Sequence, residues 1–471
     1  MPDAPARRWY DLLPHPVVML AGILALVALL TYLLPAGSFE RVEVDGRLRV
    51  VPGTYHAIAA SPVGLLAFLR ALPRGFAAAA PVIYVVIAGG IMFGALERAG
   101  AVENAIGTLV RRVGQGGKTG LLVGVTFLYG ALGVFVGYEH NAAMIPVAAV
   151  LALAIGGDLI LAAGLSVAAV TVGFGASPIN PYTVGIGHQI AGLPLFSGWG
   201  LRTVLCVGAL ALLAAYNVRY YRRVVLQATG SQDGRDSLAA GLDTTGLALS
   251  RPLADYRLTA RDGLVLACFA AGLAVMLYGV FALGWFLDEI SAVFIGIAIA
   301  VGLVARTPAT AQAESALAAV ALVAPGVFLV GLANAVRVLM DEGQIGDTIT
   351  YGLASALDGL PPVLAAVGMA GTQSLTNFLI PSGSGQALAT LPVMVPLGDL
   401  LGLTRQVTVL AFQIGDGVTN LANPTLGGLV AMLALCRVPF DRWLRFILPY
   451  LGVLALAAAG TLVLAVVTGY A

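Results

Sequence analysis

Residues 380–425 read IPSGSGQALATLPVMVPLGDLLGLTRQVTVLAFQIGDGVTNLANPT. This apolar stretch is interrupted twice by polar, glycine-rich segments, at residues 381–386 (the second tip) and at residues 415–424 (the second break). Backbone N–H and C=O groups cannot stay bare in hydrocarbon, so such interruptions persist only where protein or a water-filled site satisfies them. The stretch therefore predicts a helical hairpin whose tip lies within the membrane, followed by a broken transmembrane helix.

The composition of the whole chain also indicates a membrane protein. Of its 471 residues, 59% are hydrophobic and only 10% are charged, whereas soluble domains carry about 25% charged residues. The net charge of +1 argues against nucleic acid as a partner. The first apolar run is long enough to span a bilayer and lacks a cleavage site, so we expect it to remain as a signal-anchor helix in a bacterial inner membrane.

Spanning helices need about 20 apolar residues, and several stretches meet that length. The uninterrupted candidates are 16–37, 78–98, 200–218, 261–284, 289–306, 320–339 and 446–469. Two broken helices are expected at 159–192 and 404–435. Two re-entrant hairpins are expected at 119–157, whose centre is GYEHN at residues 137–141 (the first tip), and at 361–398. The predicted fold is therefore an all-α polytopic membrane protein.

Basic residues in the loops predict the orientation, because cytoplasmic loops are rich in Lys and Arg. The relevant groups are Arg7 and Arg8, then Arg111, Arg112 and Lys118, then Arg219, Arg222 and Arg223. They place the N-terminus in the cytoplasm and the C-terminus in the periplasm, provided that the first hairpin returns to the side it entered. Arg202 and Arg445, like Trp9, Trp199, Trp285 and Trp443, are expected to anchor helix ends at the interface.

The two halves of the chain are related by an ordered series of matches. A shift of 243 positions superimposes Asn180-Pro181 on Asn423-Pro424, Gly100 on Gly343, Ile106 on Ile349 and Arg202 on Arg445. A shift of 246 pairs Gly137 with Gly383 and Pro146 with Pro392. The second half has one additional span, at 289–306, which inverts everything after it. Inverted repeats are typical of secondary transporters that bind their substrate near the bilayer midplane.

This repeat predicts a division of the chain into six parts. They are an N-terminal helix and external loop (1–75), a first repeat (76–218), a cytoplasmic linker (219–260), scaffold helices (261–318), a second, inverted repeat (319–445) and a C-terminal helix (446–471).

The polar residues of the two helix breaks are the candidate ligands. The first break is residues 175–181, GASPINP, which matches the second break. Free amides and helix N-termini there suit an anion, and exposed carbonyl groups suit a cation. The side chains expected to add neutral oxygens and amides are Ser177, Asn180, Thr183, Thr419, Asn420, Asn423 and Thr425. A Na⁺ ion near Asn180, Asn423 and Asp416 is one expectation, and the same oxygen-rich surroundings suit a substrate carboxylate equally well.

Glu139 and Asp416 are the acids that the predicted topology places near mid-membrane. A buried charge there is costly, so such residues point to function. Proton coupling, Na⁺ ligation and pairing with a substrate ammonium group all remain open, and His140 is a further titratable candidate. The structural alternatives are that each Asn-Pro is a kink capped by its own side chain and that Glu139 caps one hairpin arm.

Three segments carry a family resemblance. They are HPVVML with LLTYLLPAGSFER near the N-terminus, SPINPYTVGIGHQIAGLPLFSGWGLR at 177–202, and the stretch 380–425 quoted above. The chain resembles the YfcC family, which is related to the anaerobic C4-dicarboxylate carriers of the DcuC type within the ion-transporter superfamily. The resemblance covers nearly the whole length.

The resemblance implies a scaffold domain and a mobile transport domain that work as a homodimer by an elevator-like movement. The binding region that it implies comprises Glu139–Asn141, Ser177–Pro181, Ser382–Gln386 (Ser382, Gly383, Ser384, Gly385 and Gln386) and Asp416–Pro424. No substrate follows from it, because relatives are assigned to C4-dicarboxylates, to arginine/ornithine exchange and to other small carboxylates.

We therefore expect a secondary active transporter, driven by H⁺ or Na⁺, for a small carboxylate-bearing metabolite. The alternative is a basic or zwitterionic amino acid antiporter, because two mid-membrane acids favour a substrate with an amino group. A channel is the rival from another class, but polarity here is confined to the two tips and two breaks. An enzyme is not expected, since no nucleophile–base pair, HExxH or metal-ligand spacing is present in the sequence.

Overall fold

Helices dominate the computed structural model, which describes residues 16–44, 47–51, 53–135, 138–230, 238–247, 249–283, 285 and 287–471. The all-α expectation needs one correction. The loop after the first helix contains two small antiparallel sheets, which pair β1 (Gly37–Ser38) with β4 (His56–Ala57) and β2 (Arg41–Val44) with β3 (Arg47–Val50). Alternating polar and apolar residues in RVEV and RLRV are typical of strands.

Seven helices among the described residues are long and apolar enough to cross a membrane. They are Ala80–Ala99, Gly116–Phe135, Trp199–Val224, Ala260–Gly279, Leu287–Val304, Ala309–Gly343 and Phe440–Val467. Shorter apolar helices are Val17–Leu33, Ile145–Ala154 and Leu159–Gly175. The chain is therefore a multi-pass membrane protein, as its composition predicts.

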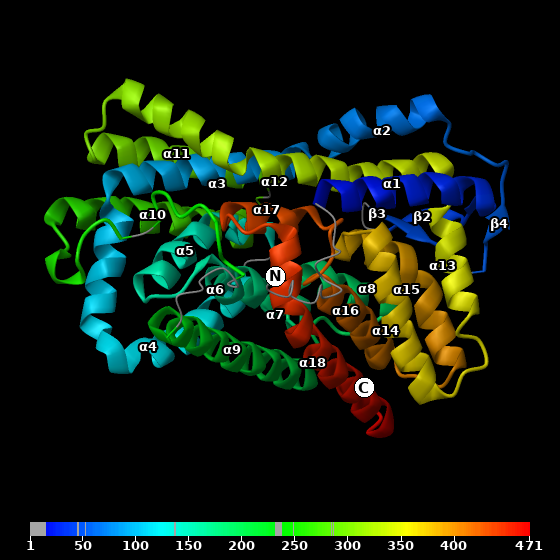
Figure 1. The fold of residues 1–471 in the computed structure, drawn as a ribbon. Coiled ribbons are helices and arrows are strands. Elements are labelled where there is room, and N and C mark those ends of the chain that lie inside the picture. The colour runs from blue at the N-terminus through cyan, green and yellow to red at the C-terminus, as the bar shows by residue number, and fades with distance from the viewer. Residues whose placement is uncertain are drawn as a thin grey trace, which may run out of the picture.

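Six helices form a layer along the upper edge of the molecule in Figure 1. They are α1 (Pro16–Leu33), α2 (Leu65–Ala78), α3 (Ala80–Ala99), α10 (Ala260–Leu283), α11 (Leu287–Val304) and α12 (Ala309–Gly343). Glycine lets their backbones approach closely, because a Cβ on Gly75 would lie only 2.6 Å from the backbone of Gly331 and Ala335. We call these six helices the upper layer.

The remainder of the first half starts with α4 (Ala101–Phe135), which bends at Gly114, where φ is 63°. A turn of 3-10 helix (η2, Glu139–Met144) leads to α5 (Ile145–Ala154), which completes a helical hairpin. A broken helix follows, and α9 (Trp199–Gly230) ends this half. The segments of the broken helix are α6 (Leu159–Ala163), η3 (Gly164–Ala168) and α7 (Ala169–Gly175), then η4 (Pro181–Gly185) and α8 (Ile186–Ala191).

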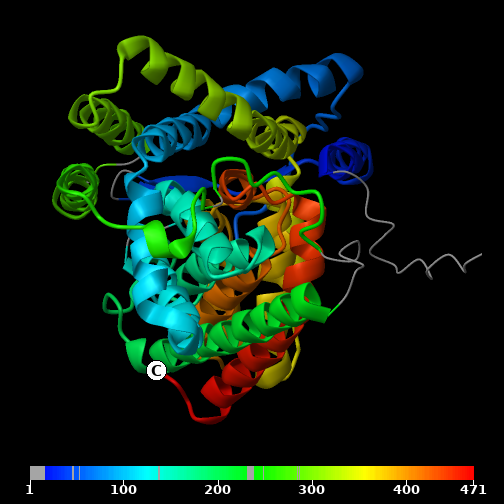
Figure 2. The ribbon, with the colours of Figure 1, turned by 60° about the vertical axis from the view of Figure 1, so that its left-hand side comes forward.

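The second half repeats this order of elements. A short helix, α13 (Gly346–Ser355), precedes the hairpin of α14 (Pro362–Leu379) and α15 (Gly383–Leu400). The broken helix is α16 (Arg405–Thr419) with α17 (Gly427–Leu435), and α18 (Phe440–Val467) closes the chain. Figure 2 shows α9 and α18 lying on the side away from the upper layer. Both hairpins and the first helix break thus lie at the predicted polar interruptions, whereas the second break is shifted, because α16 stays helical to Thr419 and the interruption covers residues 420–426.

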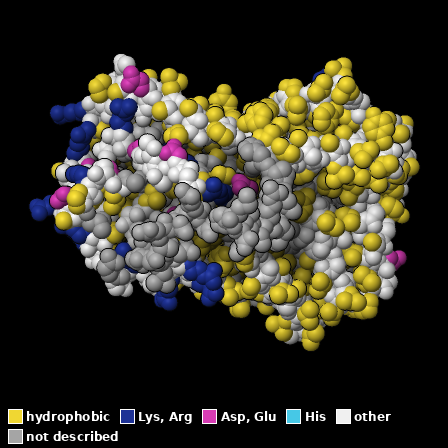
Figure 3. All heavy atoms as spheres, viewed as in Figure 1, with side chains coloured by type: hydrophobic (Ala, Val, Ile, Leu, Met, Phe, Trp, Pro, Cys, Tyr) yellow, Lys and Arg dark blue, Asp and Glu magenta, His cyan; other side chains and the backbone are white. Residues whose placement is uncertain are grey.

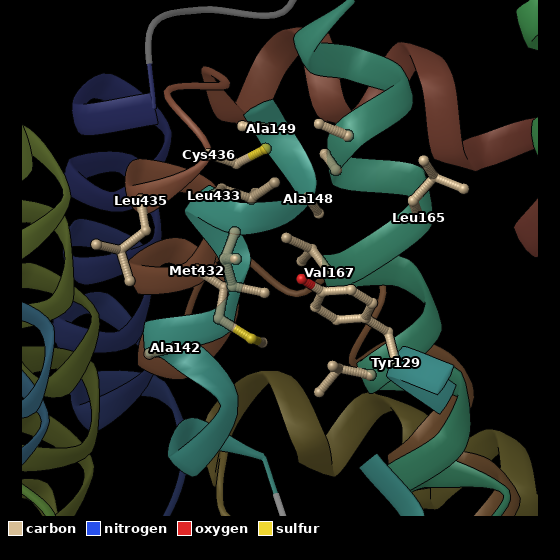
Figure 4. Close-up of a cluster of buried hydrophobic side chains, with 14 of the residues drawn as sticks. Tyr129, Ala142, Ala148, Ala149, Leu165, Val167, Met432, Leu433, Leu435 and Cys436 are labelled. Carbon is tan, nitrogen blue, oxygen red and sulfur yellow. The ribbon is translucent and has the colours of Figure 1, made fainter. Parts of the chain in front are cut away.

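The largest buried cluster joins the two halves. Figure 4 shows Tyr129 and the first-half helices beside Met432 and Leu433 of α17 and Cys436, which follows it. The Tyr129 hydroxyl is satisfied there, because it donates to the Met144 carbonyl oxygen at 2.5 Å. On the outside, hydrophobic side chains cover much of the described surface, and Lys and Arg gather toward one side of the view in Figure 3. This distribution suits a protein surrounded by lipid.

Several element bounds differ from the sequence predictions. Helices α2 and α13 were not expected, because each is too short or too polar to resemble a span. Helix α12 begins at Ala309 instead of 320, since its first turns are helical but include Gln312 and Glu314. Helix α12 continues across the predicted domain boundary between residues 318 and 319. Helix α18 likewise continues across the predicted boundary between residues 445 and 446. The division into domains itself stays a prediction.

Two expected interface anchors are instead buried. Arg202 is fully buried, and its guanidinium donates to Gln413 Oε1 and Gln406 Oε1, both at 2.9 Å. Trp443 is also fully buried and donates through Nε1 to the Leu421 carbonyl oxygen at 2.7 Å. The prediction was wrong for both, because a cationic or amphipathic residue near a helix end also suits an interior site with neutral acceptors.

Candidate functional site

The second break is tied to the second hairpin by one amide. Asn377, at the end of α14, is fully buried, and its Nδ2 donates to the Asp416 carbonyl oxygen at 3.0 Å. The same nitrogen donates to Thr419 Oγ1 at 2.9 Å and to Asn420 Oδ1 at 2.7 Å. These three bonds hold the last turn of α16 against the hairpin.

Asn423 closes the second break from the other side. Its Nδ2 donates to the Asn377 carbonyl oxygen at 2.8 Å, and its Oδ1 accepts from the backbone N–H of Thr425 at 2.9 Å. The Thr425 hydroxyl donates to the Phe378 carbonyl oxygen at 2.8 Å. Pro424, between them, is buried. The Asn-Pro pair therefore supplies the hydrogen bonds that the interrupted helix lacks.

The first break is satisfied in a similar way. Asn180 accepts from the backbone N–H of Tyr182 at 2.8 Å and donates to the Phe174 carbonyl oxygen at 3.2 Å, so it caps the helix that begins at Pro181. Ser177 Oγ accepts from the Ile179 N–H at 3.2 Å. The side chain of Pro181 lies outside the described part of the structure.

The two breaks cross at glycine. A Cβ on Gly175 would lie 2.6 Å from the Gly417 Cα, and one on Gly417 would lie 2.5 Å from the Gly175 Cα. Beside the crossing, Gln413 Nε2 donates to the Ser177 carbonyl oxygen at 2.7 Å. The broken helices of the two halves thus contact each other through bare backbone, and the predicted ligands of both breaks are brought into one region.

The second tip reaches this region as well. A Cβ on Gly383, the first residue of α15, would lie 2.6 Å from Thr183 Cγ2 and 3.3 Å from Asp416 Oδ2. Ser382 caps α15 by accepting from the Gly385 N–H at 3.3 Å. Gln386 is fully buried and turns toward α14, where it donates to both oxygens of Gln373 at 2.8 and 2.7 Å.

The first tip is described only in part. The hydroxyl groups of Tyr138 and Thr171 lie 3.1 Å apart, and Asn141 is buried, with Nδ2 3.4 Å from the Leu132 carbonyl oxygen. The side chains of Glu139 and His140 lie outside the described residues, so their predicted role in coupling stays a prediction.

A cavity of about 530 Å³ separates the tips and breaks from the upper layer. Of the predicted binding residues, its wall contains Ser382, Gly383, Ser384, Asn420 and Thr425. The opposite wall comes from α2, α3, α11 and α12. The cavity is large enough for a small metabolite, since ligand sites commonly enclose about 300–1,000 Å³.

Two helix N-termini open on this cavity. The wall includes Gly383 and Ser384 at the start of α15, and Gly427 and Gly428 at the start of α17. The first residues of α17 have no side-chain cap. Free N–H groups and the positive end of the helix dipole make such termini favourable for a carboxylate.

The cavity wall also contains residues that sequence reasoning missed. Arg337 and Asn334 come from α12, and Asp288 and Glu289 come from the start of α11. Arg337 makes an exposed ion pair with Asp341 at 3.7 Å. Its signal was present in the sequence, because it is a lone cation within the apolar stretch 320–339. Among the described residues that line the cavity, Arg337 is the one with a basic side chain.

Comparison with known proteins gives consistent matches. The family model of C4-dicarboxylate anaerobic carriers, DcuC, matches residues 13–467. The chain is 31% identical to the Escherichia coli (strain K12) protein named "Putative basic amino acid antiporter YfcC", over 99% of this chain and 98% of that protein. It is 26% identical to a Haemophilus influenzae protein without an assigned activity, over 88% and 81% of the two chains.

Two solved structures are similar over nearly the full length. Neisseria gonorrhoeae MtrF, described within a class of antimetabolite efflux pumps, has a TM-score of 0.45 at 18% identity, covering 97% of this chain and 96% of its own. The Alcanivorax borkumensis YdaH transporter has a TM-score of 0.43 at 19% identity, covering 97% and 99%.

Proposed function

Because the chain belongs to the DcuC family of C4-dicarboxylate anaerobic carriers, and is thus a membrane transporter, we propose that it moves a small carboxylate-bearing metabolite across the bacterial inner membrane. The observation that carries this proposal is the cavity into which two helix N-termini open. Transport is secondary and active, coupled to H⁺ or Na⁺.

The cavity offers complementary subsites for two carboxylates. The N–H groups that begin α15 and α17 suit one carboxylate on the side of the tips and breaks. Arg337 and Asn334 of α12 suit a second carboxylate on the opposite wall, since guanidinium groups bind carboxylates with charge-assisted hydrogen bonds. A C4-dicarboxylate has its two charges at opposite ends and therefore suits donors on opposite walls.

Coupling to a cation is supported by the acid beneath the cavity. Asp416 is only 1% exposed, and its carboxylate interacts with the side chain of Asn420 one turn further along α16. Within the described residues neither carboxylate oxygen has a hydrogen bond of ordinary geometry. A buried carboxylate with so little compensation is unfavourable in its charged form. Binding a cation there relieves that cost, which gives substrate and ion a common region in which to favour each other.

The movement proposed for transport is of the elevator type. The cavity wall is divided between the upper layer and the hairpins with their breaks, so a displacement of one body against the other would carry the bound substrate. The common order of hairpin, broken helix and long helix in the two halves supports inverted repeats. A homodimer, with the N-terminus cytoplasmic and the C-terminus periplasmic, completes the proposal.

A second candidate is an amino acid exchanger. Asp288 and Glu289 lie in the cavity wall and would attract a substrate ammonium or guanidinium group. A relative at 31% identity carries a name for basic amino acid antiport. This candidate uses the same helix N-termini for its single carboxylate.

Counterflow in proteoliposomes separates the two candidates. We expect vesicles loaded with succinate to accumulate labelled succinate, with a rate that responds to an imposed Na⁺ or pH gradient. Accumulation of labelled arginine alone, in arginine-loaded vesicles, would overturn the dicarboxylate proposal in favour of the exchanger. Flux that does not saturate with either substrate would indicate a channel.

A further inference from the structure

Besides Gln386 Oε1 within the second tip, three buried polar side chains next to that tip carry oxygens without hydrogen bonds of ordinary geometry. Asp416, Thr183 and Asn377 are 1%, 1% and 0% exposed. In the part of the chain that the structure describes, no hydrogen bond of ordinary geometry reaches Thr183 Oγ1, Asn377 Oδ1 or either carboxylate oxygen of Asp416, whose nearest compensation is the side chain of Asn420. Buried polar atoms are normally paired, because leaving one unpaired costs about 1–3 kcal/mol. Such a group of oxygens points to a missing ligand.

The three residues come from different elements that meet at one place. Asp416 lies in α16, Thr183 lies in η4, and Asn377 ends α14. Thr183 Cγ2 and Asp416 Oδ2 lie within 2.6 and 3.3 Å of the same point, the Cβ position that Gly383 leaves empty. Asn377 is held to the Asp416 backbone by its Nδ2 bond at 3.0 Å. The absence of a side chain on Gly383 therefore lets the second tip pack against Thr183 beside the carboxylate.

The balance of donors and acceptors identifies the kind of ligand. The Asp416 carboxylate and Asn377 Oδ1 can only accept hydrogen bonds, and Thr183 can donate one. The Nδ2 group of Asn377 already contacts three acceptors at 2.7–3.0 Å, which fixes the orientation of the amide. One added proton would leave acceptors unsatisfied, whereas one cation interacts with several oxygens at once. Carboxylate, hydroxyl and amide oxygens are the ligands that hard cations prefer.

The asparagines of the two breaks are already occupied. Asn180 uses Oδ1 and Nδ2 in bonds to Tyr182 and Phe174. Asn423 uses the same atoms in bonds to Thr425 and Asn377. Their side-chain oxygens serve the helix caps, so the ion position moves away from the Asn-Pro pairs and toward Asn377 and Thr183.

We propose that Asp416, Thr183 and Asn377 form a Na⁺ site that fastens the second tip to both helix breaks. This inference deepens the proposed function and rests on it, because an ion bound here is the coupling ion. Gly383 contacts the site and also begins the helix whose N-terminus lines the cavity. Na⁺ binding orders that wall and raises the affinity for substrate, and substrate raises the affinity for Na⁺ by the same factor.

The test measures Na⁺ binding to the purified full-length protein without substrate. Thermal unfolding is followed as Na⁺ replaces choline at constant ionic strength. We expect the midpoint to rise with Na⁺ and to respond much less to K⁺, since a ligand that binds the folded state stabilises it by mass action. Asp416→Asn should raise the half-saturating Na⁺ concentration by at least about tenfold, and Thr183→Val by about threefold or more.

Matched variants guard against general effects. Asp399→Asn removes an exposed acid that pairs with Arg405 at 3.0 Å, and Thr461→Val removes an exposed hydroxyl. Both should keep the wild-type Na⁺ response. Gly383→Ala places a methyl group 2.6 Å from Thr183 Cγ2, which must shift, so this variant should weaken the Na⁺ response. If Asp416→Asn does not fold, Thr183→Val and Gly383→Ala decide the question alone.

Three results would overturn the inference. The first is an unfolding midpoint that depends on pH but not on Na⁺. The second is a midpoint that is the same in choline and in Na⁺ at equal ionic strength. The third is a wild-type Na⁺ response in both Thr183→Val and Gly383→Ala. Succinate counterflow without any Na⁺ response refutes the ion site and leaves the proposed transport standing. A Na⁺-dependent unfolding midpoint without counterflow of succinate or arginine supports the ion site and refutes the proposed transport.

Discussion

The first and second breaks have the same Asn-Pro pair but differ in what their polar groups still lack. In the first break, Asn180 and Ser177 are satisfied by their own neighbours. In the second, Asn423 is equally satisfied, but among the described residues no hydrogen bond of ordinary geometry reaches either carboxylate oxygen of Asp416. The cavity wall contains Pro381–Ser384 of the second tip, Asn420 of the second break and residues 425–428 after it, and the first half adds Tyr138, Phe174 and Tyr182. The matching asparagines therefore share a structural role, and the two breaks differ at Asp416, which the shift of 243 positions pairs with Gly173.

The largest effect is expected at the crossing, where the two halves are equivalent. Gly417→Ala and Gly175→Ala each place a methyl group within 2.6 Å of the opposite Cα. Because backbone stands in the way, we expect each variant to lose stability by about 1–3 kcal/mol or more and to lose transport. Thermal unfolding and counterflow check this.

Gly460→Ala is the control for that pair, since nothing lies within 4 Å of a Cβ there. A wild-type midpoint in Gly417→Ala with a strong loss in Gly175→Ala would show that the two breaks are not equivalent even in packing.

The next largest effect is expected at Arg337, on the cavity wall opposite the second tip and second break. This variant compares the contribution of that wall to substrate binding with the contribution of the tip and break. A hydrogen bond to a charged group contributes about 1.5–3 kcal/mol, so Arg337→Gln should weaken dicarboxylate binding by roughly ten- to a hundredfold. A monocarboxylate of similar size should lose much less. Competition against labelled succinate measures both.

Arg112→Gln, which removes an exposed cation outside the cavity, is the matched control. Equal losses for the monocarboxylate and the dicarboxylate would contradict a dedicated subsite at Arg337.

The smallest effect is expected from the two asparagines. Asn423→Ala removes one hydrogen bond to α14 and two hydrogen bonds to Thr425, and we expect a loss of about 1.5 kcal/mol. Asn180→Ala removes a helix cap, which is typically worth about 1 kcal/mol. Denaturation of both variants in matched detergent gives the difference, and a larger loss at Asn180 would reverse the proposed order.

The positions of the tips and breaks could be predicted because polar, glycine-rich interruptions inside apolar stretches have few physical explanations. Whether a buried polar atom has a hydrogen-bond partner could not be predicted, because that depends on contacts between residues distant in sequence. Asn377 and Thr183 are examples, because one lies in an ordinary apolar helix and the other follows a break. Arg202 shows the same limit, since its glutamine partners lie more than 200 residues away.

Substrate protection of a single cysteine tests most directly whether the second tip lines the binding site. Cys206, Cys268 and Cys436 are replaced, and Ser384→Cys is labelled with a maleimide in proteoliposomes. We expect succinate to slow the labelling, and Na⁺ to increase that protection. Labelling at an unchanged rate, under conditions in which the same vesicles carry out succinate counterflow, would place the substrate elsewhere and contradict the proposed site.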